Sequence, residues 1–168
     1  AVAAPAASAT AILFVGTSLA AGYGLPTPEL AFPALIQKKL DAAGYRMRVV
    51  NAGVSGETSA GGLHKADWLL DRPFRILVLE LGANDGLRGL PVPEAKNNLE
   101  QMILKSQAAG ADVVLAGMTL PLNMGPDYIR AFEEMYVDLA KQYKTTLIPF
   151  FLEGVATRAD LNQEDGLH

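Results

Sequence analysis

The sequence predicts an α/β protein built on one parallel sheet with helices on both faces. Five short apolar runs predict strands. Most are continuous rather than alternating, as expected for strands covered on both sides. Segments with helical spacing separate these runs, and alternation of strands with helices is typical of a parallel sheet. The predicted strands are Ala11–Val15, Met47–Val50, Ile76–Leu81, Val113–Gly117 and Thr146–Phe151.

Apolar side chains recur at helical spacing between the predicted strands. Residues 32–43 carry one such stripe, which ends at a glycine, a common stop signal for a helix. A proline begins the next predicted helix, residues 93–110, and a glycine ends it. Residues 128–139 carry a third stripe, and residues 61–70 form a shorter predicted helix.

The composition is that of one globular domain. The 168 residues are 50% hydrophobic and 19% charged, and this length predicts a single domain over residues 11–168. The start, AVAAPAASAT, is rich in Ala, Ser and Pro, and predicts a flexible tail over residues 1–10. Such a tail remains after removal of a signal peptide, or marks the boundary of a cloned segment. We therefore expect an exported protein, periplasmic or secreted.

Charge and hydropathy limit the kinds of partner that we expect, and the cysteine content limits the chemistry. A net charge of -4 with no basic run argues against nucleic acid as a partner. No apolar stretch approaches the roughly 20 residues of a membrane span, so we expect no stable membrane insertion. The absence of cysteine excludes disulfides and a cysteine nucleophile. We expect a monomer that acts on a small-molecule substrate.

Polar loops follow the predicted strands. In a parallel sheet of this kind, ligands bind beyond the carboxyl ends of the strands. The loops at that edge are Gly16–Gly24, Asn51–Ser59, Gly82–Gly89 and Met118–Gly125, and the fifth strand leads toward Asp165–His168. These loops are the expected location of a site.

Nucleotide and metal sites are less well supported. The glycines of GYG at 22–24 begin a G-x-G-x-x-G pattern, but Thr27 takes the third glycine position and no lysine completes a Walker motif. The histidines, His64 and His168, lie about a hundred residues apart without a cysteine, which is a poor zinc set. The acidic residues lack the spacing of a calcium loop. His64 is expected to be a surface or half-buried helix residue.

An acyl-transfer site fits the loop residues better. Ser18 ends the first strand and would supply the nucleophilic oxygen, with His168 as its base and Asp165 orienting the imidazole. The loop after the second strand places Gly56, whose backbone N–H no side chain obstructs. The loop after the third strand places Asn84, whose side-chain NH₂ is a donor. With the N–H of Ser18, these two donors would form an oxyanion hole.

These residues lie in four blocks that resemble those of the SGNH, or GDSL-type, serine hydrolases. The blocks are Gly16–Leu19, Asn51–Thr58, Leu79–Gly89 and Asp165–His168. The resemblance runs from about Ala11 to the last residue. It is closest to the bacterial periplasmic branch of thioesterases, arylesterases and lysophospholipases.

The resemblance implies a fold and an activity. The fold is a three-layer α/β/α sandwich of the flavodoxin-like SGNH type, with a five-stranded parallel sheet in the order 2-1-3-4-5. The activity is hydrolysis of carboxylic esters or thioesters through a Ser-His-Asp acyl-enzyme mechanism, with no cofactor and no metal. Substrates of this kind are aryl or short-to-medium acyl esters, acyl-CoA and lysophospholipids.

The sequence departs from the family pattern in three ways. Thr17 replaces the aspartate of the usual Gly-Asp-Ser-Leu block, so a hydroxyl takes the place of a carboxylate that could bond loop amides. The second glycine of the α/β-hydrolase motif G-x-S-x-G is absent, which argues against that rival fold. His168 is the last residue of the sequence, whereas the family continues into a closing helix, so we expect that C-terminal helix to be missing.

The substrate is less well determined than the chemistry. Four apolar loop residues either form an acyl groove or are ordinary loop packing: Leu87, Leu120, Leu122 and Met124. A carbohydrate acetylesterase of the same fold, or a catalytically impaired acyl-binding domain, are the alternatives. Glu80 is either a hydrogen-bonded supporting group or a strand-end residue, and the sequence assigns it no catalytic role.

Overall fold

The computed structural model describes residues 10–168, so the predicted tail over residues 1–9 lies outside the described residues. Thr10, which the sequence assigned to the tail, is instead the first residue of strand β1 (Thr10–Gly16). It belongs to the strand because it pairs with Met47 of the neighbouring strand. No helix in the described part of the chain is both long and apolar enough to cross a membrane.

Five parallel strands form one sheet, as predicted. β1 is followed along the chain by β2 (Met47–Asn51), β3 (Ile76–Glu80), β4 (Asp112–Ala116) and β5 (Thr146–Ile148). The strand order is β2-β1-β3-β4-β5 and every pairing is parallel, which confirms the predicted fold class. The chain reverses its direction of travel across the sheet at β1 and β3. In such sheets a ligand site forms beyond the carboxyl ends of the strands at this switch point.

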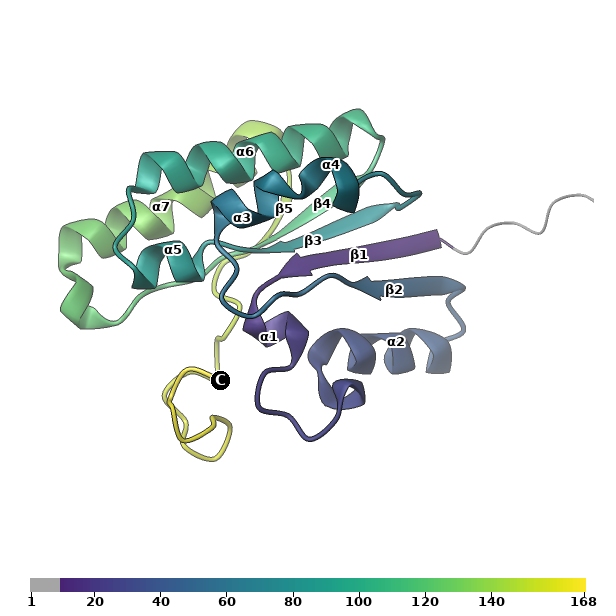
Figure 1. Cartoon of the computed structure of the whole chain (residues 1–168), viewed down its shortest axis with the longest axis horizontal. Coiled ribbons are helices and arrows are strands. Elements are labelled where there is room, and N and C mark those ends of the chain that lie inside the picture. Colours follow the sequence, from purple (N-terminus) through teal and green to yellow (C-terminus); the bar gives the residue numbers. More distant parts are fainter. Residues whose placement is uncertain (1–9) are drawn as a thin grey trace, which may run out of the picture.

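Helices cover both faces of the sheet. Figure 1 shows α3, α4, α6 and α7 on one face and α1 and α2 on the other, which gives three layers. The longer helices are α2 (Phe32–Ala42), α6 (Val92–Ala108) and α7 (Pro126–Tyr143). The shorter ones are α1 (Ser18–Ala21), α3 (Ser59–His64), α4 (Ala66–Leu69) and α5 (Ala83–Leu87), with 3-10 turns η1 (Pro28–Leu30) and η2 (Leu122–Met124).

Two predicted elements differ from those observed. The fifth strand was predicted to reach Phe151 but ends at Ile148. The carbonyl of Gly117 accepts from the N–H of Phe151 instead of that of residue 150, so the regular ladder stops after Ile148. The predicted helix over residues 61–70 is two short helices, α3 and α4. They are separated at Lys65, whose backbone N–H bonds the carbonyl of Gly62 in a tighter turn than an α-helix makes.

The core lies between the sheet and the α6–α7 layer. The fully buried leucines of the central strands belong to a single cluster that includes the inner faces of both helices. Replacing such a leucine by alanine typically lowers the free energy of unfolding by about 2–5 kcal/mol. The cluster therefore stabilises the strands whose ends carry the loops. Its members include Leu13, Leu77, Leu79 and Leu115 of the sheet, Leu99, Met102 and Ile103 of α6, and Phe132, Met135 and Leu139 of α7.

Candidate active site

A serine, a histidine and an aspartate lie in hydrogen-bond contact at the carboxyl edge of the sheet. The Oγ of Ser18 lies 2.7 Å from Nε2 of His168, although the two residues are 150 positions apart. The other ring nitrogen of His168, Nδ1, lies 2.5 Å from Oδ2 of Asp165. The structure therefore joins the three residues that the sequence singled out into one linear array.

Ser18 occupies the first position of a very short helix. Helix α1 begins directly where β1 ends, with Thr17 as its N-cap and Gly22, in the left-handed region at φ 80°, as its C-cap. The N–H of a first helical residue has no partner within its own helix. In the described part of the chain no hydrogen bond uses the N–H of Ser18. This donor thus remains available beside the serine oxygen.

Asp165 and His168 belong to one tight turn. Oδ1 of Asp165 accepts hydrogen bonds from the backbone N–H groups of Leu167, at 2.9 Å, and of His168, at 3.0 Å. The hydrogen bond to His168, followed by these backbone bonds, lowers the pKa of Asp165 from 3.8 to about 2. The ionised carboxylate can only accept, so it holds the proton of the imidazole on Nδ1 and leaves Nε2 free to accept from Ser18.

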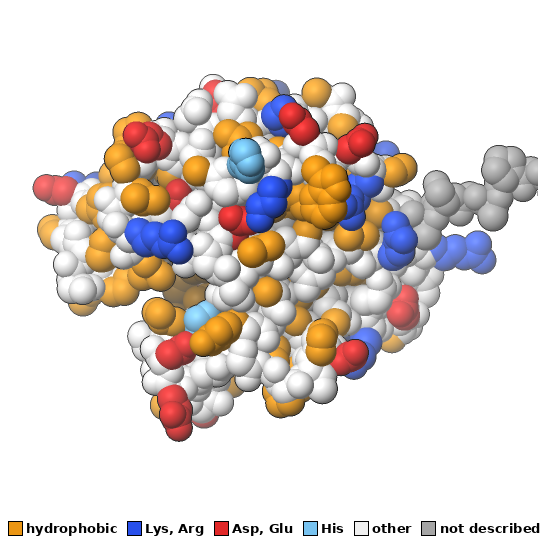
Figure 2. Space-filling view, viewed as in Figure 1, with side chains coloured by type: hydrophobic (Ala, Val, Ile, Leu, Met, Phe, Trp, Pro, Cys, Tyr) orange, Lys and Arg blue, Asp and Glu red, His pale blue; other side chains and the backbone are white. Residues whose placement is uncertain are grey.

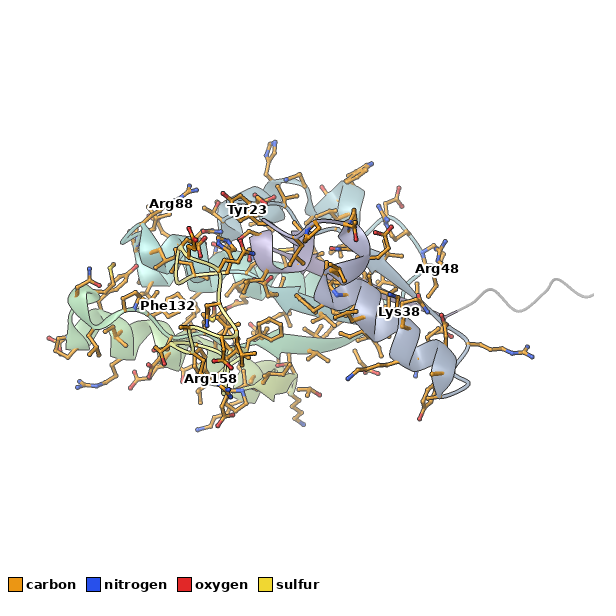
Figure 3. All side chains as sticks on the ribbon, turned by 90° about the horizontal axis from the view of Figure 1, so that it is seen from below. Tyr23, Lys38, Arg48, Arg88, Phe132 and Arg158 are labelled. Atoms are coloured by element: carbon orange, nitrogen blue, oxygen red, sulfur yellow. The ribbon has the colours of Figure 1, made fainter. Side chains whose placement is uncertain are left out.

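Tyr23 supports the histidine from the side, and nothing in the sequence pointed to it. Its ring centroid lies 4.6 Å from that of His168, with the rings tilted by 40°. The side chain of Gln163 donates to the carbonyl of Tyr23 at 2.8 Å, and its backbone N–H donates to the carbonyl of His168. Figure 3 shows Tyr23 between α1 and the C-terminal loop, so this ring links two segments that are distant in sequence.

The glycine and asparagine loops supply further donors next to Ser18. Gly56 adopts a left-handed φ of 78°, and no hydrogen bond in the described residues uses its N–H. Its carbonyl accepts from the guanidinium of Arg88 at 3.1 Å, which fixes the loop. Asn84 donates through Nδ2 to the carbonyl of Glu57 at 2.8 Å, so its amide group is held by the neighbouring loop. Ser18, Gly56 and Asn84 all line the same cavity.

This cavity has a volume of about 290 Å³, and its walls are largely apolar. Two of the four apolar loop residues that the sequence singled out, Leu87 and Leu120, line it, together with Leu152, which the sequence did not single out. The other two predicted groove residues do not line it, because the η2 turn sends them elsewhere. Leu122 is 91% exposed, and Met124 packs against the core. Figure 2 shows hydrophobic side chains along the hollow between the C-terminal loop and the rest of the molecule.

A second cavity of about 290 Å³ lies on the α2 side of the array. It shares Ser18, Tyr23 and His168 with the first cavity and is also lined by Phe32 and Phe151. Ser18 and His168 thus lie between two cavities. A substrate with groups on both sides of its carbonyl carbon could occupy both.

The second histidine and the acidic residues of the described chain do not form a metal site. His64 ends α3 and is exposed, as expected. Within residues 10–168, no group of three or more His, Cys, Asp or Glu side chains is arranged to hold a metal ion.

The parallel sheet and the serine–histidine–aspartate array define a serine hydrolase on a flavodoxin-like scaffold. The geometry agrees with a match to a protein-family model over residues 14–168. The chain belongs to the GDSL-like lipase/acylhydrolase family.

Three curated relatives are similar over nearly the whole chain. Esterase TesA of Pseudomonas aeruginosa is 48% identical over 164 residues, which cover 96% of this chain and 81% of that protein. The arylesterase of Vibrio mimicus is 41% identical over 158 residues, covering 94% and 78%. Thioesterase 1/protease 1/lysophospholipase L1 of Escherichia coli is 39% identical over 164 residues, covering 97% and 77%.

Solved structures agree with this family assignment. The crystal structure of TesA superposes with a TM-score of 0.90 at 47% identity and covers 95% of this chain and 88% of that chain. AlinE4, an SGNH-hydrolase family esterase, also gives a TM-score of 0.90, at 41% identity, covering 97% and 87%. These likenesses confirm the SGNH hydrolase fold.

Proposed function

We propose that this protein hydrolyses carboxylic esters and thioesters through an acyl-enzyme formed on Ser18. The observation that carries this proposal is the contact of 2.7 Å between Oγ of Ser18 and Nε2 of His168. A serine hydroxyl is a weak nucleophile until a neighbouring base accepts its proton, and this contact is within the reach that such a transfer needs. The curated relatives are named esterase, arylesterase and thioesterase, which supports the reaction class.

In the first step Ser18 attacks the carbonyl carbon of the substrate while His168 accepts the serine proton at Nε2. The imidazolium that forms is stabilised by Asp165, which lies 2.5 Å from Nδ1 and carries a full negative charge because its pKa is about 2. His168 then gives the proton to the departing alcohol or thiol. A water molecule repeats the sequence against the acyl-enzyme and releases the acid.

The negative charge on the tetrahedral oxygen needs donors placed in advance. The N–H groups of Ser18 and Gly56 carry no other hydrogen bond in the described residues, and the amide of Asn84 lies on the same cavity wall. We assign these three donors to the oxyanion hole. Removal of one donor of this kind typically reduces kcat by about 10²–10³-fold.

The acyl chain would occupy the apolar cavity beside the array. Leu87, Leu120 and Leu152 contribute its walls, and a volume of about 290 Å³ suits an aryl or a short-to-medium acyl group. Leu122 and Met124 are left out of this assignment because they lie away from the cavity. A carbohydrate acetylesterase of the same fold would instead act on acetyl groups of acetylated xylan.

The test compares the protein with its Ser18→Ala variant on p-nitrophenyl acetate, p-nitrophenyl butyrate, an acyl-CoA and acetylated xylan. Ser106→Ala is the matched control, because it removes a serine hydroxyl from α6 that bonds the carbonyl of Met102 and lines neither cavity. We expect Ser18→Ala to lose turnover and fluorophosphonate labelling, and the control to keep both. Equal turnover by the parent and Ser18→Ala would leave an acyl-binding domain as the function.

A periplasmic or secreted location and a monomeric state stay predictions from the sequence. Fractionation of cells that express the natural gene, with detection of the protein in the periplasm or medium, tests the location. Size-exclusion chromatography with light scattering tests the oligomeric state, for which one chain of 17.8 kDa is the expected mass.

A further inference from the structure

We propose that Glu80 is a positioning residue for the nucleophile: its ionised carboxylate accepts two hydrogen bonds from Thr17 and thereby fixes the peptide that carries Ser18. The inference rests on the proposed function of Ser18 and adds a residue that does not touch the substrate. Glu80 is the last residue of β3 and pairs in register with Gly16 at the end of β1. It therefore lies directly beside the loop that presents the serine.

Both oxygens of the Glu80 carboxylate bond the residue before the nucleophile. Oε1 accepts from the backbone N–H of Thr17 at 3.1 Å, and Oε2 accepts from the Thr17 hydroxyl at 2.7 Å. Only 2% of the surface of Glu80 and 3% of that of Thr17 is exposed, so little water competes for these bonds. Hydrogen bonds to a charged acceptor in such a site are stronger than neutral ones.

The bonds continue to the residue after the nucleophile. The Thr17 hydroxyl accepts from the N–H of Leu19 at 3.4 Å while it donates to Glu80. The peptide groups on either side of Ser18 are thus both connected to one carboxylate. The free N–H of Ser18 and its Oγ, which faces His168, lie between these two anchored points.

The local sequence leaves room for this carboxylate. A Cβ at Gly16 would lie 2.8 Å from Oε1 of Glu80 and 2.9 Å from Cβ of Ala20, both closer than real contacts allow. No lysine or arginine in the described part of the chain forms an ion pair with Glu80. A buried charge with no cationic partner is costly, whereas an apolar residue at a strand end is not. A role of the charge in positioning the nucleophile accounts for this cost.

Protonation would disturb the arrangement. Burial raises the pKa of Glu80 from 4.5 to about 7, against the opposing effect of its hydrogen bonds from Thr17. The titratable group facing it from α7 is Tyr136, whose pKa is raised by burial and by the charges of Glu80 and of Asp85 on α5. The Tyr136 hydroxyl donates to the carbonyl of Leu81. A protonated Glu80 loses the negative charge that strengthens both bonds, and one of its oxygens becomes an O–H donor that competes with the donor of Thr17 facing it.

Three variants test the role. In Glu80→Gln the amide NH₂ faces the Thr17 hydroxyl and reverses that bond. Thr17→Val removes the hydroxyl at nearly constant shape, and Thr17→Ser is its matched control because it keeps the hydroxyl. Ile103→Val, in the core of α6, controls for a general loss of stability, since Ile103 is fully buried and lies outside the site.

The assay measures kcat and KM with p-nitrophenyl butyrate from about pH 5.5 to 9, together with the rate of fluorophosphonate labelling of Ser18. We expect Glu80→Gln and Thr17→Val to lower kcat and the labelling rate about tenfold at pH 8, with KM changed by less than about twofold. The acid limb of the parent profile should be steeper than one ionisation allows. In Glu80→Gln it should follow a single ionisation, while Thr17→Ser and Ile103→Val keep the parent profile.

Different outcomes overturn different claims. If Glu80→Gln keeps the parent kcat, labelling rate and acid limb while Ser18→Ala is inactive, the positioning role is wrong and the proposed function stands. If Ile103→Val changes the profile as much as Glu80→Gln does, the effect is one of stability and the role is also wrong. If Ser18→Ala remains active, the proposed function itself fails.

Discussion

Replacement of Glu80 by glutamine should change how the stability of the protein depends on pH. The folded protein raises the pKa of this carboxyl from 4.5 to about 7 because Glu80 is almost fully buried. Between these two values the folded state holds a proton that the unfolded state has released. Stability falls with rising pH wherever the folded state binds more protons than the unfolded state. The contribution of Glu80 to the free energy of unfolding therefore declines as the pH rises through this window.

The size of the effect follows from the rise in pKa. A rise of about 2.5 from the ordinary value corresponds to about 3 kcal/mol, at about 1.4 kcal/mol for each pKa unit. The favourable contribution of the protonated form is complete below pH 4.5 and is lost as the pH rises through about 7. Glutamine does not titrate, so the variant should gain about 3 kcal/mol relative to the parent between acid and alkaline conditions.

Urea unfolding followed by circular dichroism, at several pH values from about 4 to 8, measures this difference. The loss of the bond to the Thr17 hydroxyl shifts the variant by a constant amount, and other groups titrate alike in both proteins. The diagnostic quantity is therefore how the difference in free energy of unfolding between the parent and Glu80→Gln changes with pH. A difference between parent and Glu80→Gln that stays the same across this range would refute the reasoning.

Three further predictions concern the site itself. Asp165→Asn should lower kcat by about 10⁴-fold because the wrong imidazole tautomer then faces Ser18; steady-state kinetics and labelling check this, and near-parent kcat would contradict it. Because the pKa of Asp165 is lowered to about 2, its charge is retained above pH 3.8 and is lost only as the pH falls through 2. Asn84→Ala should reduce kcat by about 10²–10³-fold with little change in KM, and an equal rise in KM would argue against an oxyanion donor. Leu120→Trp should fill the cavity and reduce kcat/KM for p-nitrophenyl butyrate more than for the acetate, whereas a uniform change would place the acyl chain elsewhere.

The strand pattern could be predicted from the sequence because burial on both faces demands continuous apolar runs. Four predicted strands agree with the observed ones to within one residue at each end. The fifth was too long, since an apolar run does not reveal that the hydrogen-bond register with β4 shifts after Ile148. The break between α3 and α4 at Lys65 was missed for a similar reason: apolar spacing continues across it while the backbone turns.

The residue types of the site were also present in the sequence, but their contacts were not. FVGTSLAAGYG alone does not distinguish a turn serine from a nucleophile, because the partner of Ser18 lies 150 residues away. The four motif blocks, taken together, predicted the pairing of Ser18 with His168. Which loop residues line the cavity could not be predicted: η2 directs Leu122 into solvent while Leu120, two residues earlier, lines the wall.

By itself, the sequence determined the parallel α/β architecture, the family and the residues able to perform acyl transfer, since apolar periodicity and motif chemistry are local properties. The tertiary structure decided which of these groups touch. It placed the ring of Tyr23 against His168. It also showed that Glu80, for which the sequence left open a supporting role, is a buried carboxylate bonded to Thr17. Side-chain contact and burial depend on how distant segments pack, and these two properties set the orientation and the pKa of the groups at the site.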